Sequence, residues 1–330
     1  MGGRIMADPV KEFLEYASYE EVDTGNIIAN TTLEQIAEAV VKKQDCILYG
    51  PPGTSKTFYI DHLPDVIGDR IAIQKTVQFH SNFSYEDFIE GIVPSEKGEG
   101  FKNESGVFFD FCDKAKDTPE DKICLFIIDE INRANVTAVF GEVLNLMEDK
   151  GQRKLFTSKR HIEFTIPKNV VIIGTMNTAD KTLAKLDFAF RRRFRFLPVF
   201  PSGEELHKMV AKEGFSSDLP LSVDEYIDCF EVLNTKILKH QQLGKNLTLG
   251  HVLWTRKSND DGPYTKSDIS RIFKETLLPQ IENYCGANRD VLASLLGPSL
   301  RDKVIYGYKI EDDDIIEYLT SLKNSKVVES

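Results

Sequence analysis

Short apolar stretches alternate with helical patterns over the first part of the chain. The helical patterns place apolar residues three to four positions apart, as at Leu33, Ile36 and Val40. Strands that are apolar on both faces belong to sheets covered by helices on both sides, so this alternation predicts an α/β fold with a parallel sheet flanked by helices. We expect strands at residues 46–49, 71–79, 123–128, 170–174 and 194–199, and helices beside them at 31–43, 57–63 and 136–147.

The pattern changes near Pro201, after which apolar positions repeat only at helical spacing. Helices are expected at residues 204–212, 223–239, 266–284 and 312–322. We therefore predict three parts, namely an N-terminal extension at 1–30, an α/β core at 31–203 and a smaller, mostly helical lid domain at 204–330. The extension opens with Met1-Gly2-Gly3-Arg4 ahead of Met6, and we interpret part of it as a remnant of an expression vector.

The acidic composition limits the kinds of partner that the chain can bind. Its net charge is −11, whereas proteins that enclose nucleic acid usually present a basic field. This charge argues against a chain that encloses nucleic acid along its whole length. No run approaches the ~18 apolar residues that a transmembrane helix needs, so we expect a cytoplasmic protein without membrane contact. The five scattered cysteines favour small buried side chains over a disulfide or zinc framework.

A loop rich in glycine and proline joins the first predicted strand to the next helix. Its sequence is Gly50-Pro51-Pro52-Gly53-Thr54-Ser55-Lys56-Thr57. In a phosphate-binding loop (Walker A), backbone N–H groups of the turn and of the helix N-terminus surround the phosphates of a nucleotide. Lys56 is expected to bind the β- and γ-phosphates, and Thr57 to offer a hydroxyl to Mg²⁺. Ser55 stands where glycine is usual, so we expect its Cβ to crowd the backbone without abolishing binding.

Two adjacent carboxylates follow the buried strand predicted at 123–128. In open α/β sheets, ligands bind outside the carboxyl ends of the strands, which is where Asp129 and Glu130 are expected (Walker B). Asp129 would hold Mg²⁺, largely through its water ligands, and Glu130 would orient and deprotonate the attacking water. Alternatively, Asp129 only caps a helix. The loop and the acidic strand end together predict a Mg²⁺-dependent nucleoside triphosphatase, but they do not distinguish ATP from GTP because the loop contacts no base.

Longer motifs surround these residues. They include Asp129-Glu130-Ile131-Asn132-Arg133-Ala134-Asn135, Gly174-Thr175-Met176-Asn177-Thr178-Ala179-Asp180-Lys181 and residues 83–91, 140–143, 146–148, 187–194 and, more weakly, 249–251. Over residues 33–255 the chain resembles the McrB family, the AAA+ motors of McrBC-type modification-dependent restriction systems. The resemblance implies an AAA+ P-loop NTPase core followed by a helical lid. It also implies a homo-oligomeric, hexameric ring and an McrC-like nuclease subunit as the partner. DNA would then be contacted only indirectly or through a partner.

The resemblance assigns roles to three further side chains. Asn177 is similar to the sensor asparagine that contacts the γ-phosphate or its water. Arg193 resembles the arginine finger that reaches into the site of a neighbouring subunit, with Arg192 as the alternative finger or a supporting contact. A guanidinium there stabilises charge on the transferring phosphoryl group, whereas the alternative is a solvated basic cluster. Lys181 stands where the family has arginine, which puts a bidentate contact across a subunit boundary in doubt.

Three functions are compatible with the sequence. The favoured one is an NTP-driven, McrB-like motor that acts with a nuclease in DNA restriction and antiviral defence. The second is a MoxR- or dynein-like ATPase that remodels proteins. The third is a nucleotide-binding scaffold that hydrolyses weakly, which Ser55 and Lys181 suggest. A basic hairpin predicted at 151–165 would face a ring pore, a partner nuclease or solvent.

Overall fold

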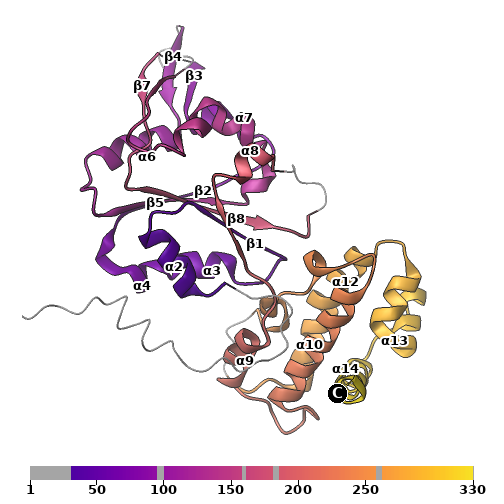
Figure 1. Ribbon diagram of the computed structural model, residues 1–330. Coiled ribbons are helices and arrows are strands. Elements are labelled where there is room, and N and C mark those ends of the chain that lie inside the picture. Colours follow the sequence, from indigo (N-terminus) through magenta and orange to yellow (C-terminus); the bar gives the residue numbers. More distant parts are fainter. Residues whose placement is uncertain (1–30, 95–99, 158–160, 181–185, 258–261, 330) are drawn as a thin grey trace, which may run out of the picture. The chain divides into compact units, whose positions relative to one another are not determined.

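Two compact units make up the chain. The computed structural model describes residues 31–94, 100–157, 161–180, 186–257 and 262–329 (Figure 1). The first unit comprises Met1–Tyr49 and Lys56–Pro198, and the second comprises Gly50–Ser55 and Val199–Ser330. The short segment Gly50–Ser55 therefore groups with the C-terminal part of the chain, although the first unit flanks it in the sequence. The predicted domain boundary between residues 203 and 204 stays a prediction.

The first unit is built on a five-stranded sheet with the order β2-β5-β8-β1-β9. The strands are β1 (Cys46–Gly50), β2 (Ile71–Gln78), β5 (Ile123–Asp129), β8 (Val170–Asn177) and β9 (Arg195–Pro198). The pairs β2–β5, β5–β8 and β1–β9 are parallel. Strands β5 and β8 are buried along nearly their whole length, as expected for apolar strands with helices on both faces. The predicted α/β class is confirmed.

Helices cover both faces of this sheet (Figure 1). On one face lie α2 (Leu33–Val41), α3 (Lys56–Asp61) and α4 (Leu63–Ile67), and on the other lie α6 (Val107–Lys116), α7 (Val136–Phe140) and α8 (Phe188–Arg191). Aromatic rings fill the second face. Phe88 stacks on Phe108 with ring centroids 4.7 Å apart, and Phe108 meets Phe126 of β5 at 4.9 Å. Burial of these rings fixes β5, and with it the residues that follow the strand.

Several elements differ from the sequence prediction. The helix expected at 136–147 ends at Phe140, because Gly141 adopts a φ of +51° and a 3-10 helix, η3 (Gly141–Leu146), continues the chain. The basic hairpin is formed by β6 (Leu155–Phe156) and β7 (Glu163–Phe164), while residues 158–160 lie outside the described part. The prediction missed a second hairpin, formed by β3 (Glu90–Pro94) and β4 (Phe101–Ser105). It also missed the helices α5 (Tyr85–Phe88), α6 and α8 in this unit and α13 (Arg289–Tyr306) in the second.

The second unit is helical in its C-terminal part, as predicted. Its helices are α9 (Gly203–Ala211), α10 (Val223–Lys239), α11 (Lys266–Ile272), α12 (Leu278–Cys285), α13 (Arg289–Tyr306) and α14 (Asp312–Glu329). A 3-10 helix, η5 (His251–Trp254), packs on α10, where the buried Trp254 ring meets the rings of Tyr226 and Phe230. Within the described residues, no helix combines the length and the apolar character that a bilayer crossing requires.

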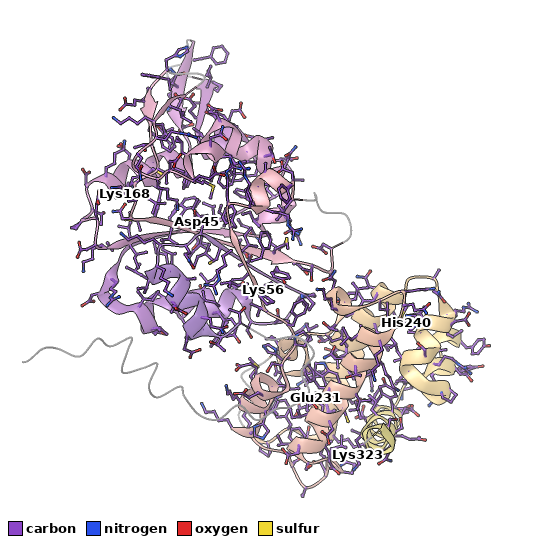
Figure 2. The ribbon with its side chains drawn as sticks, viewed as in Figure 1. Asp45, Lys56, Lys168, Glu231, His240 and Lys323 are labelled. Carbon is purple, nitrogen blue, oxygen red and sulfur yellow. The ribbon has the colours of Figure 1, made fainter. Side chains whose placement is uncertain are left out.

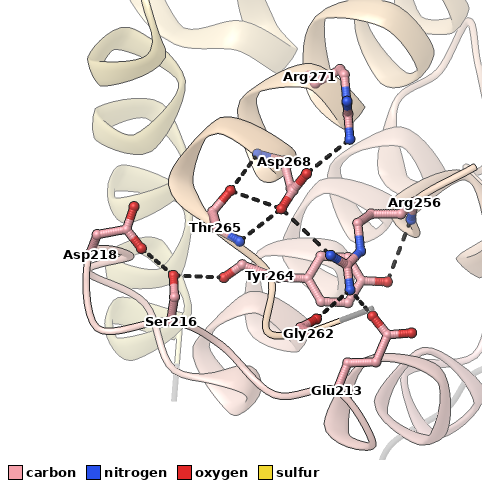
Figure 3. A network of polar contacts seen from close by, with 9 residues as sticks. All are labelled: Glu213, Ser216, Asp218, Arg256, Gly262, Tyr264, Thr265, Asp268 and Arg271. Carbon is pink, nitrogen blue, oxygen red and sulfur yellow. Dashed lines mark hydrogen bonds and ion pairs between the residues drawn. The ribbon is translucent and has the colours of Figure 1, made fainter. Parts of the chain in front are cut away.

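An almost fully covered arginine ties three segments of this unit together (Figure 3). The Arg256 side chain is 5% exposed, and its guanidinium carbon lies 4.1 Å from the centroid of the Tyr264 ring. The guanidinium also pairs with Glu213, just after α9, and lies 3.7 Å from Asp268 in the first turn of α11. Because a desolvated guanidinium needs such partners, these contacts fix the segment that directly follows η5.

Candidate functional site

The first six residues of the predicted phosphate loop, Gly50–Ser55, form a tight turn in the second unit. Gly53 and Ser55 both adopt left-handed backbone conformations, with φ of +74° and +63°. Thr54 is buried, and its hydroxyl donates a hydrogen bond to the Pro51 carbonyl at 3.0 Å, which closes the turn. Glycine adopts a left-handed φ at little cost, whereas the Cβ of Ser55 makes the same conformation strained. The serine therefore needs support at this position.

Lys56 and Thr57 begin α3 in the first unit. Burial lowers the pKa of the Lys56 ammonium to about 8, and the carboxylates of Glu130 and Asp129 oppose that shift (Lys56 is labelled in Figure 2). A triphosphate near Lys56 would favour its charged form further. Thr57, the second residue of the helix, is exposed. Within the first unit, the predicted phosphate-binding cation Lys56 is thus close enough to Asp129 and Glu130 for their charges to interact.

Thr175 of β8 holds the acidic strand end together. The parallel register pairs Ile128 with Gly174, so Thr175 follows beside Asp129, the last residue of β5. The Thr175 hydroxyl donates to Asp129 Oδ1 at 2.5 Å and accepts a hydrogen bond from the Glu130 N–H at 3.0 Å. One side chain thereby orients the predicted Mg²⁺ ligand Asp129 and the predicted catalytic base Glu130. Thr175 lies within one of the motifs noted in the sequence, but this role was not predicted.

Glu130 is held in an unusual conformation. Its φ of +53° is left-handed, and its side chain is 22% exposed. Its carboxylate oxygen Oε2 lies 3.3 Å from Arg133 Nε, and Arg133 Nη2 lies 3.2 Å from Asp180 Oδ2. Left-handed non-glycine residues concentrate at functional sites, because the surrounding structure must enforce them. The sequence analysis missed Arg133 as a partner of Glu130, although the arginine is three residues away in the same quoted motif.

Asn177 ends β8, and its contacts connect it to the residues that follow β5. Its side-chain Oδ1 accepts a hydrogen bond from the Ala179 N–H at 3.1 Å, and its carbonyl accepts one from Asn132 Nδ2 at 3.2 Å. The carboxyl ends of adjacent parallel strands thus bring Asn177 to the same edge as Asp129. Lys181, the departure from the family pattern, lies outside the described residues.

The two predicted finger arginines have different environments. Arg193 is 4% exposed in its side chain, donates to the Ala189 carbonyl and lies 3.2 Å from Asn145 Oδ1 and 3.4 Å from Glu148 Oε1. The Arg192 side chain is 55% exposed, with one ion pair to Glu148 at 3.2 Å. Arg193 is therefore engaged within its own subunit, whereas Arg192 can reach outward.

Both arginines line a hollow of about 610 Å³ on the first unit. Its lining, as far as the structure describes the chain, includes neither Lys56 nor the carboxylates of Asp129 and Glu130. The hollow is mostly basic and is lined by Lys43, Gln44, Asp45, Met147, Glu148, Lys150, Lys168, Arg192, Arg193, Phe194 and Arg195. The structure thus joins Lys56, Asp129, Glu130 and Asn177 at one edge and keeps the arginine pair apart from them within this subunit.

The predicted Mg²⁺ ligands fit the chemistry of that ion. Among the described residues, no group of three His, Cys, Asp or Glu side chains could hold a metal by itself. Mg²⁺ does not require such a cage, since it usually takes one or two protein ligands and completes its shell with phosphate oxygens and water. Asp129 and Thr57 match that partial ligand set.

Comparison with known proteins supports the family suggested by these residues. Residues 45–194 match the AAA domain family, dynein-related subfamily. The chain is 36% identical over 297 residues to the type IV methyl-directed restriction enzyme EcoKMcrB subunit of Escherichia coli (strain K12), which covers 86% of this chain and 62% of that protein. It is 28% identical over 190 residues to the type II restriction enzyme BsuMI component YdiS of Bacillus subtilis (strain 168), covering 46% of this chain and 55% of that protein.

The matches span less than two thirds of the length of either relative. Among solved structures, a putative ATPase from Cytophaga hutchinsonii matches 87% of each chain at 13% identity with a TM-score of 0.35. The matched AAA domain contains the strand ends that carry Asp129, Glu130 and Asn177. Residues 45–194 therefore form an AAA domain of the dynein-related subfamily, and over 86% of its length the chain is similar to the McrB subunit of a restriction enzyme.

Proposed function

We propose that this protein hydrolyses ATP or GTP with Mg²⁺ and works as the motor of an McrB-type restriction system. One observation carries the proposal, namely the convergence of Lys56, Asp129 and Glu130 at the edge where β5 and β8 end. A cation for the phosphates, a carboxylate for the metal and a carboxylate for the water are what phosphoryl transfer to water needs.

Each of these residues would have a separate role in the reaction. Lys56 would stabilise negative charge on the β- and γ-phosphates, and Asp129 with Thr57 would hold Mg²⁺, which neutralises charge on the phosphate oxygens. Glu130 would accept a proton from the attacking water. Its pairing with Arg133 keeps the carboxylate beside the strand end before the water is in place. Asn177 at the end of β8 would position the water or the γ-phosphate.

We further propose that Arg192 completes the site of a neighbouring subunit. Its 55% exposure supports this role, whereas the contacts of Arg193 within its own subunit disfavour the finger role predicted for that residue. A contact of this kind repeats head to tail from subunit to subunit, which gives a closed ring, proposed to be a hexamer. The name of the Escherichia coli relative, a restriction enzyme subunit, supports a nuclease partner. We also propose that DNA is contacted through that partner, in keeping with the net charge of −11, and that the protein works in the cytoplasm.

Phosphate release tests the enzyme assignment. The full chain is assayed with ATP and with GTP, in Mg²⁺ and in EDTA, beside a Glu130→Gln variant. We expect turnover with at least one nucleotide, loss of turnover in EDTA, and a fall of about 10²–10⁴-fold in the variant, because general-base catalysis contributes that much. The variant should still bind nucleotide, which a fluorescent mant-nucleotide measures.

Two outcomes would count against the proposal. Wild-type turnover equal to that of Glu130→Gln with both nucleotides would favour a nucleotide-binding scaffold. Light scattering that reports a monomer for Glu130→Gln with Mg²⁺ and either nucleotide, at micromolar protein, would contradict the ring and with it the role of Arg192.

A further inference from the structure

Ser55 hydrogen-bonds to a buried histidine that is far away in the sequence. Ser55 Oγ lies 2.8 Å from Nε2 of His251, 196 positions along the chain. His251 is the first residue of η5 and is 1% exposed. Both residues belong to the second unit. Because the bond is made while Ser55 has its left-handed φ of +63°, it favours the conformation that the Cβ of serine disfavours.

The segment around His251, residues 249–254, supports the phosphate loop over several consecutive residues. The Val252 N–H donates to the Gly53 carbonyl at 3.0 Å. A Cβ added to Gly250 would lie 2.2 Å from the Gly53 carbonyl carbon, and a Cβ added to Gly53 would lie 2.7 Å from Leu253 Cγ. Both distances are below any normal contact, so Gly250 lies directly against the backbone of Gly53, and Gly53 lies directly against the side chain of Leu253.

The support segment is itself anchored to α10 at both ends. Asn234 of α10 donates to the Leu249 carbonyl at 3.0 Å and accepts from the Leu249 N–H at 2.6 Å. At the other end, the Tyr226 hydroxyl donates to the Trp254 carbonyl at 2.9 Å. The Arg256 contacts of Figure 3 hold the chain just beyond it. The His251 ring therefore projects from a backbone with little freedom to follow the loop.

We propose that His251 is a positioning residue that holds the phosphate loop in its binding conformation through Ser55. With glycine before the lysine, the left-handed φ needs no help, and the loop is independent of this contact. With serine there, the binding conformation of the loop depends on a hydrogen bond to the helical unit. This inference rests on the proposed nucleotide binding. Ser55 would then couple phosphate binding to the support segment.

A double-mutant cycle tests the proposal. The Kd for mant-ATP and mant-GTP is measured in Mg²⁺ for the full chain, with and without His251→Ala, in the wild-type and in the Ser55→Gly background. We expect His251→Ala to raise Kd about tenfold in the wild-type background and less than about twofold in the Ser55→Gly background, since residues in direct contact couple and independent ones add. His251→Gln, which keeps a hydrogen-bonding group, should recover part of the loss.

The same cycle distinguishes positioning from packing. Equal losses of nucleotide affinity in both backgrounds would overturn the proposal, because His251 would then act by filling space. An unchanged Kd in the wild-type background would overturn it as well. His207→Ala is the matched control, since His207 lies on α9 with a side chain that is 49% exposed. Thermal melting of every variant establishes that it is folded.

Amide hydrogen exchange without nucleotide separates this proposal from the proposed function. The peptide that covers residues 50–55 is followed in the same four proteins. We expect His251→Ala to speed its exchange in the wild-type background and to have little effect in the Ser55→Gly background. If the wild-type chain binds neither nucleotide, the proposed function fails, but this measurement still decides whether His251 holds the loop. Equal acceleration in both backgrounds would contradict the proposal.

Discussion

The acidic strand end and the arginine pair belong to the same unit, yet different parts of the structure place them. At the strand end, the parallel register of β5 and β8 sets Thr175 beside Asp129, so the backbone of the sheet positions the reactive side chains. Arg192 and Arg193 are adjacent in the chain, so the position of the backbone alone does not show which of them can act as a finger. The side-chain environment does, because Arg193 is 4% exposed and Arg192 is 55% exposed.

This difference bears on how each region can work. Catalytic groups at the ends of buried strands are held by a core that resists deformation, so their geometry is nearly fixed before substrate arrives. An exposed arginine has no such support and acquires a defined position only when a partner surface provides one. We therefore infer that the strand end is complete within one subunit and that Arg192 depends on assembly.

Replacing Arg192 tests the second half of this contrast and should have the largest effect. We expect Arg192→Ala to lower turnover by about 10³-fold or more, because a finger arginine contributes that much to phosphoryl transfer. Its melting temperature should stay within experimental error, since an exposed ion pair contributes little to stability. Phosphate release and thermal melting of the full chain provide the two measurements.

Mixing subunits shows whether Arg192 acts across a boundary. A mixture of Arg192→Ala and Glu130→Gln subunits contains interfaces at which an intact Glu130 faces an intact Arg192. Turnover of the mixture should exceed that of either variant alone. If mixing recovers nothing although light scattering shows joint rings, Arg192 does not act in the neighbouring site.

The same contrast explains how much the sequence could predict. Strand ends follow from apolar runs, and ligands bind outside the carboxyl ends of the strands, so Asp129 and Glu130 were predicted from the pattern alone. Asn177 was predicted only from the resemblance to a family. The roles of Thr175 and Arg133 depend on which atoms meet across the edge, and no spacing rule encodes that. Helix ends set by a left-handed residue, as at Gly141, are equally hard to predict. The support of Ser55 by His251 joins residues 196 positions apart and needs the tertiary structure.

Removing the Thr175 hydroxyl tests the first half of the contrast. Thr175→Val keeps the shape of the side chain but deletes the donor to Asp129 and the acceptor for the Glu130 N–H. We expect turnover to fall by about 10–100-fold, the usual loss when a group that orients a metal ligand is removed. Thr157→Val is the matched control, because Thr157 is also buried but bonds the Ile162 N–H in the β6–β7 hairpin. Equal turnover in the two variants would show that Thr175 does not orient the catalytic groups.

Arg193→Ala should have the smallest effect on catalysis and a visible effect on stability. The substitution removes the donor to the Ala189 carbonyl and to Asn145 Oδ1. The pair with Glu148 adds little, because the Glu148 side chain is 45% exposed and water screens the charge. The lost hydrogen bonds amount to about 1–2 kcal/mol, so the melting temperature should fall in Arg193→Ala and not in Arg192→Ala. The reverse pattern, with unchanged melting but lost turnover for Arg193→Ala and normal turnover for Arg192→Ala, would transfer the finger role to Arg193. In that case the covered conformation of Arg193 would have to open when subunits assemble, because a side chain that is 4% exposed and bonded to Ala189 and Asn145 cannot at the same time contact a phosphate on a neighbour.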